Sequence, residues 1–292
     1  MTITEIDVAA GRVRVTRRLA LAVEVYDVAA ARPAGEGLLV GVETERSVAR
    51  AMAAWRRGRP SVWPAVPLRN HGGGRFMLDY GPAIGGTVRI RVVDPRLRWT
   101  PRRISVDLWT LAEVEAVDGQ TPGAAVPALS RVLRVGLLPG PAYAVAGATG
   151  ARLSVMTQQG APVPWARVEA FSAIGRVGWG HGDEQGEVMV LASHLQGIPP
   201  DEPESFMVAL RPHVRDPATV GPPPEPELPP TDRLHDLVLE TAVLPHPPQP
   251  RPVLDTDLAL GLTVPAGWIT GTDQVETLRV GAIRRFDIEV PQ

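Results

Sequence analysis

Short runs of alternating apolar and polar residues dominate the first hundred positions of the chain. An alternation at every second residue is typical of a strand with one buried face. The clearest runs are residues 18–28, 36–44, 75–80, 86–94 and 102–109. Within residues 86–94 (GTVRIRVVD), apolar residues alternate strictly with Arg89 and Arg91, which predicts one apolar face and one arginine face. The pattern indicates antiparallel sheets with one face buried.

One segment has the helical period instead. Residues 46–58 (RSVARAMAAWRRG) place Val48, Met52 and Trp55 on one side and end at Gly58. The sequence therefore predicts one short helix around residues 46–57.

The second part of the chain begins after a stretch without periodicity. Residues 113–130 read as a linker, and strand-like runs separated by glycine and proline turns follow. Proline-rich tracts at 217–230 and 245–252 are typical of polyproline II connectors. The predicted fold is mainly β, with two tandem antiparallel β-sandwich domains of the Ig-like or transthyretin-like kind. We expect the first domain at residues 11–112, the linker at 113–130 and the second domain at 131–292.

Two short motifs in the second block carry a family resemblance. Residues 160–171 (GAPVPWARVEAF) and 181–190 (HGDEQGEVMV) resemble the transthyretin-like β-sandwich family that includes carboxypeptidase regulatory-like domains. The resemblance implies a tight turn at Gly160 and Pro162 and a second hairpin at Asp183 and Gly186. It also implies that Ala166 and Val168 point into the core.

Residues 67–108 are more loosely similar to the same pattern, so the chain has the character of a tandem member. As a whole it is similar to accessory proteins of phage tail-like contractile injection particles. This family serves as a scaffold in many settings, so the resemblance implies a fold more strongly than a function.

The composition changes the functional picture. All 30 basic residues are arginine, in a chain of 292 residues with a formal net charge of −2. A nucleic-acid-binding protein usually carries a basic excess, so no nucleic-acid partner is expected. The charge is unevenly distributed: residues 1–110 hold 18 Arg and 10 acidic residues (+8), and the remainder holds 12 Arg and 22 acidic residues (−10). Opposite halves of this kind can attract each other or a neighbouring copy, and the alternative is simply two domains with different surfaces.

A His followed by three glycines, residues 71–74, is the oxyanion-hole signature of one group of lipases and esterases. Such an enzyme also needs a Gly-x-Ser-x-Gly nucleophile elbow, and none of the eight serines lies in that pattern. We therefore interpret Gly72–Gly74 as a turn that leads into the strand at 75–80, and we predict no catalytic residues.

Other chemistry finds little support in the sequence. No two of the six histidines have the i, i+4 spacing of a zinc site, and no phosphate-binding loop is present. His181, Asp183 and Glu184 could surround a cation, but turn chemistry explains Asp183 without one. With no cysteine in the chain, thiolate chemistry and disulfides are excluded. We expect no metal and no cofactor.

The segment after the predicted helix is the best candidate for an interface. Residues 55–63 (WRRGRPSVW) lie outside the strand pattern and combine the two residue types that dominate interface energetics. The candidate interface residues are Trp55, Arg56, Arg57, Arg59 and Trp63. The alternative is that the segment folds back over its own sandwich, more so for Trp63 than for Trp55.

These observations predict a non-enzymatic structural or adaptor subunit of a bacterial phage tail-like assembly. Its expected partners are other protein subunits, with further copies of the chain among the candidates. The alternative is a stand-alone surface module that binds carbohydrate or protein. No run approaches the roughly 20 apolar residues that span a bilayer, and Glu24 and Asp27 interrupt an export-like stretch at 12–31. The expected location is the cytoplasm, from which an assembled particle could be released.

Overall fold

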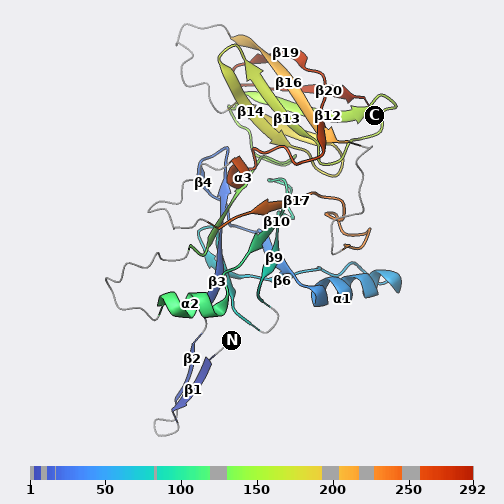
Figure 1. The fold of residues 1–292 in the computed structure, drawn as a ribbon. Coiled ribbons are helices and arrows are strands. Elements are labelled where there is room, and N and C mark those ends of the chain that lie inside the picture. The colour runs from blue at the N-terminus through green and yellow to red at the C-terminus, as the bar shows by residue number, and fades with distance from the viewer. Residues whose placement is uncertain are drawn as a thin grey trace.

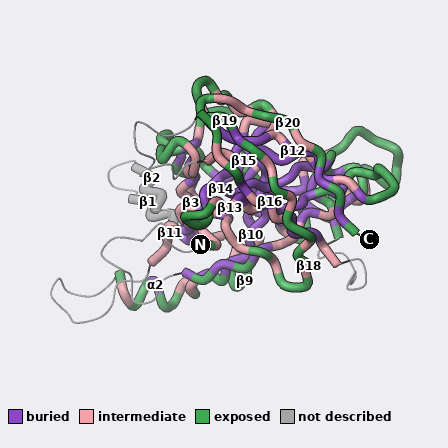
Figure 2. The backbone as a smooth tube through the Cα atoms, turned by 90° about the horizontal axis from the view of Figure 1, so that it is seen from above, coloured by how far each residue is buried: buried purple, intermediate pink, exposed green. Residues whose placement is uncertain are grey.

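A computed structural model describes residues 3–7, 12–16, 18–81, 84–118, 130–192, 204–216, 227–244 and 257–291. Two β-rich domains lie one above the other, and a separate hairpin of β1 (Ile3–Asp7) and β2 (Arg12–Thr16) lies at the N-terminal end (Figure 1). The predicted mainly β sandwich fold is confirmed. Buried segments run through the centre of the molecule, and exposed segments surround them (Figure 2).

The first domain consists of two five-stranded sheets. One has the order β17-β10-β9-β5-β6, and the other the order β11-β3-β8-β7 with β4 paired to β3. The strands are β3 (Leu19–Asp27), β4 (Arg32–Pro33), β5 (Leu39–Glu43), β6 (Val66–Pro67), β7 (Arg69–Gly72), β8 (Arg75–Asp79), β9 (Thr87–Val93), β10 (Arg102–Asp107), β11 (Val132–Leu137) and β17 (Leu239–Ala242). The alternating residues of β3 and β9 meet between the sheets, where Leu21, Val23 and Ile90 are fully buried. This packing is the source of the period seen in the sequence.

A single eight-stranded sheet forms the second domain. Its order is β18-β16-β13-β14-β15-β12-β20, and β19 pairs with β16. The strands are β12 (Gly150–Thr157), β13 (Arg167–Ser172), β14 (Gly175–His181), β15 (Glu187–Ala192), β16 (Ser205–Arg215), β18 (Trp268–Thr270), β19 (Gln274–Arg279) and β20 (Ile283–Val290). The sheet curves until β19 and β20 lie beside each other (Figure 1). Its inner face encloses a second core that includes Ala166 and Val168, as the motif predicts.

Two strands do not follow the predicted domain boundaries. Residues 132–137 were expected in the second domain, but β11 pairs in parallel with β3, Val132 opposite Ala22. Likewise β17, which follows a proline-rich tract, pairs in parallel with β10. The second half of the chain therefore supplies an edge strand to each sheet of the first domain. A third parallel pair joins β12 to β20, and the other ladders are antiparallel.

The described part of the chain contains three helices, where one was predicted. Helix α1 (Glu45–Arg56) confirms the predicted one. Helix α2 (Leu111–Asp118) occupies the start of the predicted linker, whose residues 119–129 lie outside the described part. The short α3 (Asp257–Leu260) lies close to β11 and β17. Thr110 explains α2, because its hydroxyl accepts from Glu113 N–H while the Glu113 carboxylate accepts from Thr110 N–H, a capping box.

Candidate functional site

Helix α1 begins at a well-formed cap. The Thr44 hydroxyl accepts a hydrogen bond from Ser47 N–H at 3.1 Å, and the Ser47 hydroxyl oxygen accepts from Thr44 N–H at 3.0 Å. The Ser47 hydroxyl also lies 2.8 Å from the carbonyl of Pro64. One residue therefore closes the first turn of the helix and attaches it to the segment that returns from the helix to β6.

The buried side of α1 faces this returning segment more than the sandwich. Its buried residues are Ser47, Val48, Ala51 and Ala54. None of them belongs to the hydrophobic core between the two sheets, and Arg59 N–H donates to Ala54 C=O at 3.0 Å. Of the three residues predicted to share one side of the helix, Val48 is buried, Met52 is half-buried and Trp55 is exposed. Helix and return segment form an insertion, residues 45–65, that projects from the first domain (Figure 1).

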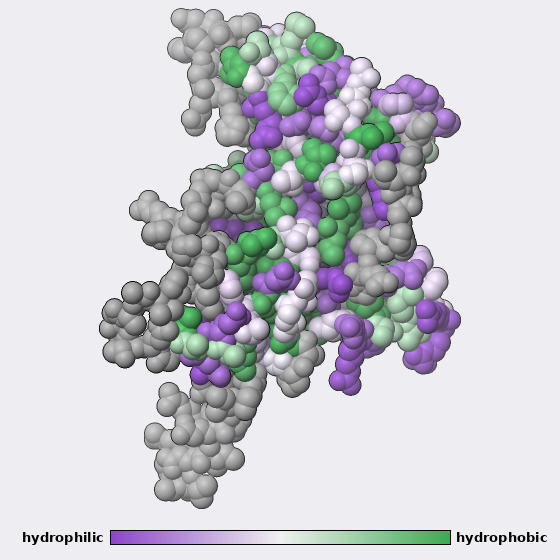
Figure 3. Space-filling view, viewed as in Figure 1, coloured by the Kyte–Doolittle hydropathy of each residue, from purple (hydrophilic) through white to green (hydrophobic). Residues whose placement is uncertain are grey.

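The exposed side of this insertion is strongly basic. Arg46, Arg50, Arg56, Arg57 and Arg59 are all exposed and form no ion pair with any residue that the structure describes. Glu45 is the one acidic residue of the insertion. The surface over α1 is mostly hydrophilic (Figure 3), and Trp55, 38% exposed, adds an apolar ring at the end of the helix. Trp55, Arg56, Arg57 and Arg59 of the predicted interface are therefore brought together.

Trp63 separates from this group. It is half-buried, and the Arg91 guanidinium lies 4.4 Å from its ring centroid. Arg91 is fixed in turn by two hydrogen bonds of 2.7 and 3.1 Å to the Asp232 carboxylate. Trp63 thus packs back onto its own domain, where it borders an open groove of about 410 Å³. The groove is lined by Leu38, Leu39, Val40, Trp63, Pro67, Leu68, Asn70 and Phe76.

The sequence predicts that the arginines of β9 lie on an exposed face of the sheet. The structure instead buries arginines of β9 and of its neighbour β10. Arg91 and Arg103 are 1% exposed, because residues 227–244 cover them. Arg103 forms two hydrogen bonds with Glu43, at 3.0 and 2.9 Å. The local sequence could not predict that these arginines are buried, because the segment that covers them lies some 140 residues away in the chain.

Arg102 has a related role at the junction of the two domains. Glu240 of β17 binds Arg102 of the first domain at 2.9 and 3.0 Å and lies 3.4 Å from Arg167 of the second. The buried Trp165 packs against Leu234 and Leu237 in a small cluster between the domains. A buried charge is tolerated only when it is paired. We therefore assign these ion pairs to the fold and not to a functional site.

The His-Gly-Gly-Gly motif forms the hairpin between β7 and β8. Gly72, Gly73 and Gly74 have φ angles of 79°, 56° and 75°, which confirms the predicted glycine turn. The exposed His71 accepts a hydrogen bond from Arg69 at its Nε2. Among the described residues, the glycines of the motif therefore form a turn.

His181, Asp183 and Glu184 at the second hairpin each have a separate partner. Asp183 accepts hydrogen bonds from the N–H groups of Gln185 and Glu187, as its turn requires, and Glu184 pairs with Arg233. The His181 ring is buried and bonds to Gly261 C=O at 2.6 Å. No group of residues in the described ranges is arranged to hold a metal ion.

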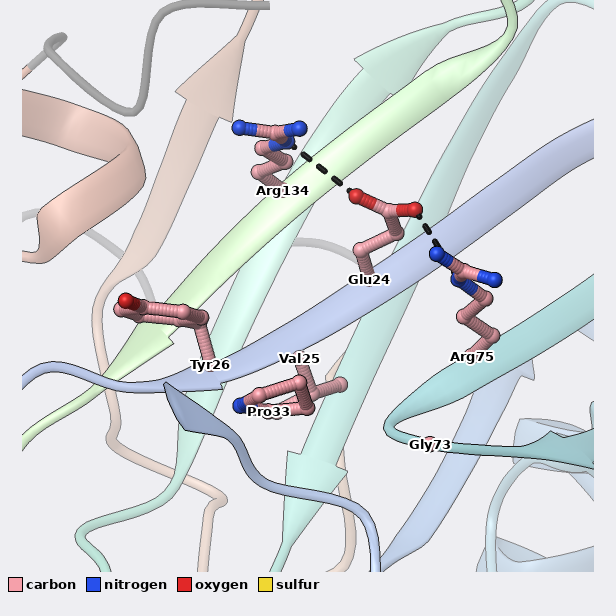
Figure 4. Close-up of a pocket in the computed structure, with 7 residues that line it drawn as sticks. All are labelled: Glu24, Val25, Tyr26, Pro33, Gly73, Arg75 and Arg134. Carbon is pink, nitrogen blue, oxygen red and sulfur yellow. Dashed lines mark hydrogen bonds and ion pairs between the residues drawn. The ribbon is translucent and has the colours of Figure 1, made fainter. Parts of the chain in front are cut away.

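A small pocket of about 150 Å³ on the outer face of the sheet that contains β3 is also accounted for by internal contacts. Glu24 lies between Arg75 and Arg134, 3.2 Å from each (Figure 4). This ladder across three strands satisfies the carboxylate. The α1 insertion remains the strongest candidate site.

Comparisons with known proteins add no function. No family model and no curated protein matches the chain. Among solved structures, shaft pilin SpaA from Lactobacillus rhamnosus GG has 7% identity and a TM-score of 0.21 over 94% of this chain and 98% of the pilin chain. A point mutant of the same pilin has 6% identity and a TM-score of 0.22 over the same shares. Scores this low carry no argument about fold or role. None of the helices in the described ranges is long and apolar enough to cross a bilayer.

Proposed function

We propose that this protein is a non-enzymatic structural or adaptor subunit that binds other protein subunits through the α1 insertion. The observation that carries the proposal is the contrast between two sets of arginines. Those on β9 and β10 that are buried are bonded to carboxylates, whereas the five on the insertion are exposed and form no ion pair among the described residues.

A surface arginine without an ion pair is well hydrated and costs the fold little, but it contributes little to stability either. Five of them around an exposed tryptophan on a projecting element are typical of a binding surface, because Arg and Trp dominate interface energetics. The capped helix also presents them on a rigid frame, which lowers the entropy lost on binding.

In finer detail, we infer that the partners are subunits of a bacterial phage tail-like contractile injection assembly. The inference is supported by the resemblance of residues 160–171 and 181–190 to transthyretin-like domains and by the arrangement of two β-rich domains in tandem. A cytoplasmic site of assembly is part of the same proposal.

The test is the variant Trp55→Ala, Arg56→Ala, Arg57→Ala, measured for incorporation into particles from the producing cells. We expect incorporation to fall about tenfold or more, because truncating one hot-spot residue costs about 2 kcal/mol. Circular dichroism should show an unchanged fold, since the three side chains are exposed.

The matched control is Val243→Ala, Arg32→Ala, Arg96→Ala, which also truncates one exposed apolar residue and two exposed arginines. The control should assemble like the wild type. Normal incorporation of the insertion variant would refute the proposed interface, and equal losses in both variants would show that general surface charge is responsible.

A further inference from the structure

The second domain carries two exposed carboxylates on β20, called its acidic edge below, that form no ion pair or hydrogen bond with the described residues. Strand β20 hydrogen-bonds to β12 along one side and ends the order of the sheet, and on its other side it lies beside β19 without a ladder among the described strands. Asp287 and Glu289 are exposed on β20 and have no ion pair or hydrogen bond with the described residues. Nearby Arg285 is already bound to Glu187 at 3.1 Å. The C-terminal half of the strand therefore presents two free carboxylates.

The spacing of these carboxylates fits the arginines of α1. Asp287 and Glu289 are two residues apart on a strand, a separation of about 6.8 Å along one face. Arg46 and Arg50 are four residues apart on a helix, which is about 6 Å along one face. Each of the two long guanidinium side chains can thus meet one carboxylate without strain in either backbone.

The two surfaces belong to different molecules in such a contact. Helix α1 projects from the first domain, and β20 lies in the second domain at a clear distance from it (Figure 1). A contact between them joins the first domain of one copy to the second domain of the next. Such a contact is heterologous, so its repetition gives a ring or an open filament.

We propose that the α1 insertion binds the acidic edge of β20 in a second copy of this chain, head to tail, through Arg46 and Arg50 against Asp287 and Glu289. The proposal rests on the proposed function of the insertion and names its partner. A second copy is favoured over a nucleic acid, since the net charge of −2 and the −10 of residues 111–292 repel a polyanion.

Sedimentation velocity of the purified chain tests this proposal directly. In about 50 mM salt we expect association that grows with protein concentration, and in about 500 mM salt we expect monomers, because exposed ion pairs are screened. The double variants Arg46→Glu, Arg50→Glu and Asp287→Arg, Glu289→Arg should each remain monomeric. An equimolar mixture of the two should associate again, since every contact in an alternating chain then pairs opposite charges.

Arg32→Glu, Arg96→Glu is the control, because it makes the same change in net charge at exposed arginines away from the insertion. It should associate like the wild type. Three outcomes overturn the proposal: a monomeric wild type in low salt, no recovery in the mixture, or binding of duplex DNA in place of self-association. If self-association is absent but the Trp55, Arg56, Arg57 variant still loses incorporation into particles, the proposed function stands and only the partner is wrong.

Discussion

Gly74 is the residue of the glycine turn that the fold depends on most. Its φ is 75°, and a Cβ added there would lie 2.6 Å from the carbonyl oxygen of Val25, part of the backbone of β3. Gly72 and Gly73 also have positive φ, but an added Cβ at either meets open space. The three glycines therefore share a backbone conformation and differ in steric room.

Replacing each of the three by valine separates these two effects. Gly72→Val and Gly73→Val should each lower the free energy of unfolding by about 1 kcal/mol, the lower end of the range for backbone strain. Gly74→Val should cost more than about 3 kcal/mol, because the clash with β3 adds to the strain. Urea denaturation of the three variants measures this, and equal losses at all three positions would contradict the steric argument.

His181 makes the stability of the protein sensitive to mildly acidic pH. Burial, with a smaller contribution from the nearby Arg167 and Arg102 guanidinium groups, holds its pKa well below the usual 6.5. The unfolded chain takes up a proton near pH 6.5 and the folded chain does not, so protonation favours unfolding. As the pH falls below about 6.5, His181 removes about 1.4 kcal/mol of stability per pH unit, until the folded pKa is reached.

The expected result is a melting temperature that falls between about pH 7.5 and pH 5.5. The variant His181→Gln keeps a donor for Gly261 C=O and stays neutral, so its melting temperature should depend less on pH, even if it is lower throughout. His71→Gln is the control, since His71 is exposed. A slope in His181→Gln as steep as in the wild type would show that other groups are responsible.

At the scale of elements, the sequence pattern predicted the helix and strands that each bury one face. The period of 3.6 residues located α1, and strict alternation located β3 and β9, because each of these elements buries one face. The positions of β11 and β17 could not be predicted in this way. Each pairs with a strand more than 100 residues away, and the register of such a pair depends on tertiary packing.

The candidate site was likewise predictable from the sequence only in part. Its tryptophans and arginines were evident from composition at residues 55–63, and the structure brings four of the five predicted residues together on an exposed surface. The sequence favoured folding back more for Trp63 than for Trp55, but it could not show what holds Trp63 in place, because that contact depends on the distant pair of Arg91 and Asp232. Arg46 and Arg50 were missed, although their spacing of four within a predicted helix was a usable signal.

For the whole molecule, the shared strands indicate that the first domain is not an independent folding unit. Residues 11–112 were predicted to form it, yet its two sheets each end on a strand from later in the chain, β11 and β17. Without β11 and residues 227–244, the core between the two sheets would lose Leu133, Val135, Leu137, Ala242 and Leu244. Fully burying one Leu or Val side chain contributes about 1.5 to 3 kcal/mol, and a domain of this size has a total stability of only about 5 to 15 kcal/mol.

We therefore expect a fragment of residues 11–112 to lack a cooperative fold. Five lost core residues and two exposed sheet edges together remove most of the stability that a domain of this size has. Calorimetry should show no unfolding transition for the fragment and a single shared transition for the full chain, in which Glu240 joins Arg102 of one domain to Arg167 of the other. A sharp transition in the isolated fragment would mean that the first domain folds without β11 and β17. Its absence would mean that the second half of the chain completes the first, so that α1 is presented only by the whole protein.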